Sequence, residues 1–180
     1  MAGIKLNKLK LEITKYIGIP YFTNNPPVNF PYIPDNVVLG KGTSRDIALK
    51  TIELANLEKI KLLDLSPQQI YNFQKKHHLG IDCSGLACHL LNFYFDKNID
   101  ARKTSADMLT SPPLSKNIPI SKATTGDLIR TNHGHHVIFI IEKIGQILHC
   151  VDSSHHHRGV RYQEISLNSP LLLENVYRLN

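Results

Sequence analysis

Of the three cysteines in this 180-residue chain, Cys83 has the surroundings best suited to a nucleophile. Apolar residues recur at helical spacing from this position onward, which predicts an amphipathic helix with the thiol in its first turn. Unpaired N–H groups and the positive end of the helix dipole stabilise a thiolate there, and the thiolate is the form that attacks a carbonyl carbon. Free cysteine is also among the most buried residue types. From its position alone, Cys83 is therefore equally well interpreted as a nucleophile or as a core residue.

A nucleophilic thiol needs a base, and the ten histidines of the chain supply candidates. His133, His135 and His136 lie just before or at the start of an apolar segment with strand-like alternation, and His149 lies in the next such segment. If an even-length turn near residues 142–145 joins these strands, His136 and His149 share one face of the sheet and lie diagonally across from each other. A turn one residue longer or shorter would separate them. One imidazole that orients another fits the nucleophile, base and orienting group of a hydrolytic triad.

The same histidines leave a zinc-dependent hydrolase open as an alternative. The cluster at residues 133–136 could bind a metal together with His149 or Asp152, although no His-Glu-x-x-His helix or other firm ligand spacing is present. A further run, residues 155–157, falls in a predicted loop, where solvent-exposed histidines are commoner than metal ligands.

The motifs around Cys83 and His136 resemble those of the NlpC-type cell-wall hydrolases, which are cysteine peptidases with a papain-like fold. Residues 80–86, Gly-Ile-Asp-Cys-Ser-Gly-Leu, resemble the Asp-Cys-Ser-Gly-Leu signature of that family. Segments similar to its Arg-Thr-Ser stretch, its Gly-Asp-Leu and His-Val strands and two later strands follow in order, at residues 102–107, 126–129, 136–140, 148–149 and 159–161. Each motif alone is weak, but their combination over about 100 residues is specific, and it favours a catalytic Cys83.

The resemblance implies hydrolysis of peptide bonds in peptidoglycan stem peptides, beside γ-linked D-glutamate, by a Cys83–His136–His149 triad without a cofactor. Cys83 would attack as a thiolate, and its own N–H would help to hold the oxyanion. His136 would take the thiol proton and later protonate the leaving amine, His149 would orient His136, and water would hydrolyse the thioester. Asp82 and Ser84 match positions that bind a free substrate amine in parts of the family; helix capping is an equally good role for them.

One segment departs from the family pattern. Residues 18–22, Gly-Ile-Pro-Tyr-Phe, match the first half of the family's Gly-x-Pro-Tyr-x-Trp-Gly-Gly segment, but Thr-Asn-Asn replaces the second half at residues 23–25. Sixty-one residues then separate Tyr21 from Cys83. We expect Tyr21 to reach the site as a substrate-binding residue and the inserted residues 22–80 to shape the cleft.

Two other functions are compatible with the same resemblance. One is an inactive NlpC-like module that binds an anionic polymer, although the complete Cys, His and His set argues against it. The other is an acyltransferase or deamidase acting on protein, since such enzymes use the same triad.

The elements that must position these groups form a helical part followed by a strand-rich part. Periodicity and capping signals predict five helices, a proline-rich loop at residues 20–36 and five strands; the helices are expected at residues 4–17, 43–63, 66–76, 83–94 and from 104 or 105 to 112, and the strands at 127–131, 136–141, 147–152, 159–165 and 174–179. The second helix is apolar on most sides and is expected to be largely buried. This order predicts an α+β fold, with helices on one face of an antiparallel sheet of about five strands. We expect a single catalytic domain over 1–180, with an elaborated helical part at 1–79 and a catalytic core at 80–180; the resemblance implies the papain-like NlpC-type version of this fold.

Charge is unevenly distributed along the chain. The net charge is +6, and residues 1–80 contribute +5 of it, from 11 basic and 6 acidic residues. This excess suits an anionic partner such as a cell-wall polymer, nucleic acid or a lipid surface, although a solvated basic face is the commoner explanation. Such a partner would be bound by the helical part rather than by the triad. We expect peptidoglycan fragments or stem peptides as partners, and no nucleic acid.

Hydropathy predicts neither a signal peptide nor a transmembrane segment, because the longest aliphatic–aromatic run, residues 137–141, has five residues. Three cysteines are compatible with a reducing compartment. A cytoplasmic location, or export by a route without a signal peptide, is therefore expected.

Overall fold

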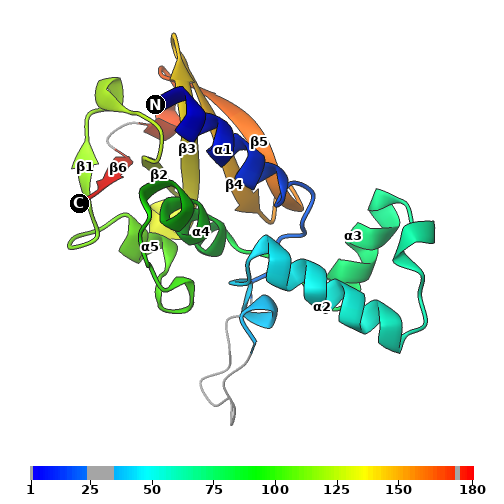
Figure 1. Cartoon of the computed structure of the whole chain (residues 1–180). Coiled ribbons are helices and arrows are strands. Elements are labelled where there is room, and N and C mark those ends of the chain that lie inside the picture. Colours follow the sequence, from blue (N-terminus) through cyan, green and yellow to red (C-terminus); the bar gives the residue numbers. More distant parts are fainter. Residues whose placement is uncertain (1, 24–34, 173–174) are drawn as a thin grey trace.

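A six-stranded antiparallel sheet forms the centre of the structure, a computed structural model that describes residues 2–23, 35–172 and 175–180 (Figure 1). Its strand order is β1-β6-β2-β3-β4-β5. The strands are β1 (Ser115–Ile118), β2 (Leu128–Thr131), β3 (His136–Ile144), β4 (Ile147–Ser154), β5 (Gly159–Ser166) and β6 (Val176–Leu179). The predicted α+β class is confirmed. β1 was not predicted, because its four residues contain a single apolar side chain, and it pairs with β6 at the edge of the sheet.

Five α-helices accompany the sheet in the described part of the chain: α1 (Ala2–Thr14), α2 (Ser44–Leu57), α3 (Pro67–Lys76), α4 (Cys83–Phe95) and α5 (Ala106–Leu109). Local chemistry determines where they begin. Thr43 and Ser66 form capping boxes at the starts of α2 and α3, and Ser105 caps α5. Most of the proline-rich segment predicted at residues 20–36 lies outside the described residues.

The prediction for α2 was wrong in two respects. The helix ends at Leu57 and not near residue 63, because the chain turns into a left-handed conformation at Lys59 (φ 58°). It is also not largely buried: Leu49 and Ile52 are about half exposed, at 55% and 48%. In Figure 1, α2 and α3 extend sideways from the body of the molecule, so only one side of α2 has protein to pack against.

Helices α1 and α4 lie against the same face of the sheet (Figure 1). Their buried side chains, including Leu9 and Leu90, join Val137, Phe139 and Val151 of the sheet in one apolar cluster. A second cluster on the other face contains residues such as Ile138, Ile140 and Cys150. Burial on both faces holds β3 and β4 firmly, and these two strands carry His136 and Asp152.

A β-bulge interrupts the pairing of β3 with β4. Ile140 pairs with Cys150 and Glu142 with His149, so Ile141 is an extra residue without a partner in β4. Ile141 and Glu142 therefore lie on the α1 side of the sheet together. Because of this extra residue, each β3 side chain before the bulge points to the opposite face of the sheet from the one it would have in a hairpin without a bulge.

Three segments remote in sequence meet just before α4. Isolated bridges pair Tyr21 with Ile81 and Lys41 with the same Ile81. The approach requires glycine at position 40: its φ is 73°, and a Cβ there would lie 2.1 Å from the carbonyl oxygen of Phe22. Tyr21, Lys41 and Ile81 are thereby brought together at the start of the cysteine-bearing helix.

No helix in the described ranges combines the length and the apolar character that crossing a membrane requires.

Candidate active site

Cys83 is the first residue of α4, as the sequence predicts, and its environment is well ordered by hydrogen bonds. Asp82 is the N-cap, and its Oδ1 accepts a hydrogen bond from the N–H of Gly85 at 2.6 Å. From β4, the hydroxyl of Ser153 donates to the carbonyl oxygen of Ile81 at 2.6 Å, which ties the start of the helix to the sheet. The Cys83 side chain is almost buried, at 6% exposed, and its Sγ lies 4.0 Å from the carbonyl oxygen of His135.

His136, the first residue of β3, faces both a thiol and a carboxylate. Its Nε2 lies 2.9 Å from Oδ2 of Asp152, whose side chain is 2% exposed, and Oδ1 of Asp152 accepts a hydrogen bond from Gln163 at 2.8 Å. Burial of the ring lowers its pKa, but hydrogen bonds to Asp152 and Cys83 outweigh this effect and raise the pKa of His136 to about 9. With Nε2 bonded to Asp152, the nitrogen left for the thiol is Nδ1.

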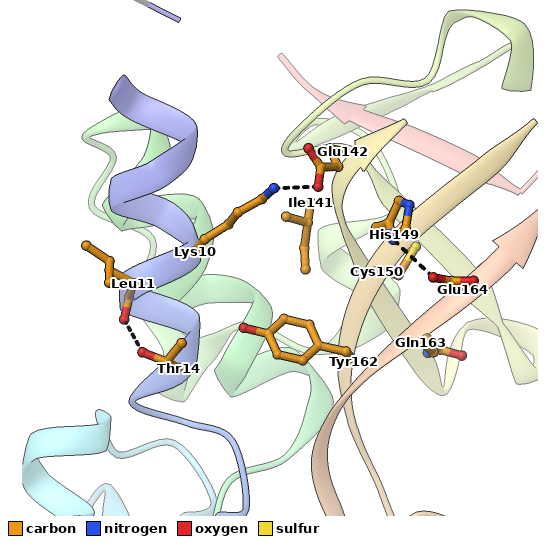
Figure 2. A pocket seen from close by; sticks show the side chains of 10 residues that line it. All are labelled: Lys10, Leu11, Thr14, Ile141, Glu142, His149, Cys150, Tyr162, Gln163 and Glu164. Atoms are coloured by element: carbon orange, nitrogen blue, oxygen red, sulfur yellow. Dashed lines mark hydrogen bonds and ion pairs between the residues drawn. The ribbon is translucent and has the colours of Figure 1, made fainter. Parts of the chain in front are cut away.

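The structure does not bring His149 to His136. The bulge at Ile141 puts His136 in phase with Asp152 and leaves His149 on the α1 side of the sheet. There Nδ1 of His149 lies 3.4 Å from Oε1 of Glu164, in a pocket of about 510 Å³ beneath α1 that Figure 2 shows. The expected His136–His149 pairing is therefore corrected: Asp152, which the sequence suggested only as a metal ligand, is the group that contacts His136.

Cys83 opens into a separate pocket of about 530 Å³. Its lining includes the predicted substrate-binding residues Tyr21, Asp82 and Ser84, together with Gly134, His135 and the segment 102–107. Burial, followed by the nearby Cys83 and Asp82, raises the pKa of Tyr21 to about 12, so its hydroxyl stays protonated and can donate a hydrogen bond. The structure thus gathers Tyr21 at Cys83 despite the 61 residues between them.

Lys41 is a site residue that the sequence analysis missed. Its side chain is 13% exposed, and Nζ lies 2.9 Å from Oδ1 and 2.8 Å from Oδ2 of Asp82. The same ammonium donates a hydrogen bond to the hydroxyl of Ser84. The only hint in the sequence is the position of Lys41 between two glycines, which allow its backbone to pass close to other segments.

Another part of the pocket wall, the segment that contains Asp107, is held in place from the sheet. Arg130 of β2 forms an ion pair with Asp107 of α5 at 2.5 Å. Its other guanidinium nitrogen donates to the carbonyl oxygen of Thr110 and the hydroxyl of Ser111. The segment that resembles the Arg-Thr-Ser motif is thereby fastened to the strand next to β3.

The remaining cysteines and histidines have other environments. Cys88 and Cys150 are both 0% exposed, and burial raises the pKa of each to about 12, which makes them poor nucleophiles at neutral pH. His133 and His135 are exposed. Within the described ranges, no three His, Cys, Asp or Glu side chains are grouped so that they could hold a metal ion.

Comparisons of the chain with family models, curated proteins and solved structures give no match. What the site can do therefore follows from its own chemistry. A thiol at a helix start, an imidazole beside it and a buried carboxylate behind the imidazole form a nucleophile, a base and an orienting group.

Proposed function

We propose that this protein is a cysteine hydrolase of the NlpC type, with a papain-like fold, that cleaves peptide bonds in peptidoglycan stem peptides beside γ-linked D-glutamate. The observation that carries the proposal is the position of His136: its Nε2 lies 2.9 Å from the buried Asp152 carboxylate, and the Cys83 thiol is close enough to raise the pKa of the ring. The motif resemblance supports the substrate class. Asp152 takes the orienting role that the resemblance suggested for His149.

In the proposed reaction, Nδ1 of His136 takes the proton of Cys83, and the thiolate sulfur forms a bond to the substrate carbonyl carbon. Nε2–H of His136 donates to Asp152, whose negative charge stabilises the imidazolium. The N–H of Cys83 belongs to the first turn of α4, where N–H groups lack intrahelical acceptors, so it is suited to hold the oxyanion.

The tetrahedral intermediate then collapses by breaking the carbon–nitrogen bond, and the imidazolium gives its proton to the leaving amine. A water molecule, deprotonated by His136, attacks the thioester and releases the acid and the free thiol. Asp152 remains ionised throughout and keeps the ring oriented.

Digestion of defined muropeptides, followed by mass spectrometry, tests this proposal. The wild-type protein should release fragments that identify the cleaved bond, and Cys83→Ala should release none while its circular dichroism spectrum stays unchanged. Cys88→Ala is the matched control, because Cys88 lies in the same helix but is fully buried; this variant should keep its activity.

Two results would contradict the proposal. Cleavage retained in Cys83→Ala would exclude the thiol as nucleophile. A Cys83 that does not react with iodoacetamide at neutral pH would instead favour an inactive binding module, since a thiolate paired with an imidazolium reacts readily.

A further inference from the structure

The carboxylate of Asp82, at the wall of the Cys83 pocket, is already paired within the chain. Both of its oxygens lie within 3 Å of the ammonium of Lys41, and the hydroxyl of Ser84 accepts a hydrogen bond from the same group. The side chains of Lys41 and Asp82 are only 13% and 10% exposed. A substrate ammonium could bind Asp82 only by displacing a largely buried lysine, which would lose its partner.

The backbone of Lys41 is held as firmly as its side chain. Its carbonyl oxygen lies 2.9 Å from Nε2 of His89, and the residue is bridged to Ile81. The carbonyl of the preceding residue, Gly40, accepts a hydrogen bond from the N–H of Asp82 at 2.9 Å. Lys41 is therefore a built part of the pocket wall and not a flexible surface lysine.

The other charges around the pocket leave it with an excess of cations. Asp107 is neutralised by Arg130, as Asp82 is by Lys41. Arg102 and Lys103 also line the pocket. Lys103 is 84% exposed and lies 3.7 Å from Asp100, so solvent screens that pair and leaves the charge available.

We propose that Lys41 determines the substrate specificity of Cys83: its ammonium fills the Asp82–Ser84 position, so the pocket takes acyl groups that carry a carboxylate instead of a free amine. This inference rests on the proposed role of Cys83 as nucleophile. It replaces the expectation that Asp82 and Ser84 bind a substrate amine.

Two methanethiosulfonate reagents that differ only in their head group test the charge preference without requiring the natural substrate. One carries a sulfonatoethyl group and the other an aminoethyl group; the Cys83 thiolate forms a mixed disulfide with either and releases methanesulfinate. Rates are measured by intact mass and peptide mapping and compared with those of glutathione. Wild-type protein should favour the sulfonate over the ammonium reagent roughly tenfold more than glutathione does.

Lys41→Gln removes the charge but keeps a hydrogen-bond donor near Asp82, and it should lower the ratio of the two rates roughly tenfold or more. The double variant Lys41→Gln/Asp82→Asn should return the ratio towards the wild-type value. Lys116→Gln, on the exposed side of β1, is the control and should leave the ratio unchanged.

The outcomes separate the two proposals. No reaction of Cys83 with either reagent would contradict the proposed function. Ready reaction with a wild-type ratio equal to that of glutathione would overturn the role of Lys41 and leave the nucleophile in place, and this comparison holds even if a variant fails to fold. The role of Lys41 would also be overturned if the ratio of the two rates were the same in Lys41→Gln and in the wild-type protein.

Discussion

Exchanging Asp152 for asparagine tests which residue orients the base. In the wild-type protein, Nε2–H of His136 donates to Asp152, which leaves Nδ1 free to accept the thiol proton. The asparagine can still accept the hydrogen bond from Gln163 through its oxygen, and its amide then presents a donor to Nε2. Nε2 must therefore accept, the proton moves to Nδ1, and Nδ1 can no longer act as the base.

The size of the effect follows from two quantities. A wrong tautomer of this kind lowers turnover by roughly 10⁴-fold in serine proteases with the analogous substitution. The pKa of His136, raised from 6.5 to about 9, corresponds to about 3 kcal/mol of preference for the imidazolium, and the hydrogen bond to Asp152 is the largest single favourable contribution. Asp152→Asn should thus reduce hydrolysis by roughly 10³- to 10⁴-fold and bring the pKa of His136 down towards its ordinary value.

Hydrolysis of a defined stem peptide and the pH profile of Cys83 alkylation by iodoacetamide are the assays. The alkylation profile reports the thiolate–imidazolium pair directly, so it does not depend on the choice of substrate. His149→Asn is the matched control, and it should behave like the wild-type protein in both assays. A loss in His149→Asn as large as that in Asp152→Asn would refute the assignment of Asp152 and restore the triad expected from the sequence.

Three further predictions concern stability, each measured as the free energy of unfolding in urea. Since the pKa of His136 is raised on folding, its contribution of about 3 kcal/mol should be fully present below pH 6.5 and be lost as the pH rises through about 9; a flat profile would contradict this. Arg178→Met should lower the free energy of unfolding by about 3 kcal/mol, because the carboxylate of Asp127, 1% exposed, would lose a bidentate ion pair. A decrease below about 1 kcal/mol would contradict this and show that water replaces the arginine. Gly40→Ala should destabilise by about 2 kcal/mol or more, since its Cβ would meet a backbone oxygen at 2.1 Å, whereas Gly3→Ala in α1 meets nothing within 4 Å and should be neutral or stabilising.

Local patterns in the sequence predict the elements of this fold well. The start of α4 follows from Asp82 as cap and from the apolar stripe that begins at Cys83, and both are properties of a dozen consecutive residues. Five of the six strands follow from alternation and turn signals. The class of the fold and the positions of Cys83 and His136 at the starts of α4 and β3 were predictable for this reason.

The contact of Asp152 with His136 could not be predicted in the same way. Side chains alternate between the two faces along β3 and β4, and a two-residue turn at residues 145–146 joins the strands. In a hairpin without a bulge, this arrangement would put His136 and His149 on the same face. A single bulged residue, Ile141, reverses the outcome. Nothing in the local pattern marks this residue, because it is apolar and continues an apolar run, and its position depends on packing against both faces of the sheet.

Lys41 shows a second limit, which arises from contacts between distant segments. The lysine is 41 residues from Asp82 in the chain, and only the folded insertion brings them together. From the charge of +5 on residues 1–80, we predicted that this part of the chain binds an anionic partner away from the triad, and this remains a prediction. One of those charges, however, is the ammonium of Lys41, which forms an ion pair with Asp82, the N-cap of α4.

The insertion that departs most from the NlpC pattern is therefore also the part that changes the chemistry of the pocket. Residues that resemble the family supply the proposed nucleophile, the proposed base and Tyr21, and the first two are placed by α4 and the sheet. The inserted chain returns to the same place at Lys41, where Gly40 and Ile81 hold it and Asp82 accepts its charge. An insertion that only covered the surface would leave Asp82 open to solvent or to a substrate cation. Here the ammonium of Lys41 neutralises Asp82. Under the two proposals, the reaction and the choice of substrate therefore depend on different parts of the chain, and Lys41→Gln should change the choice of substrate while Cys83 stays reactive.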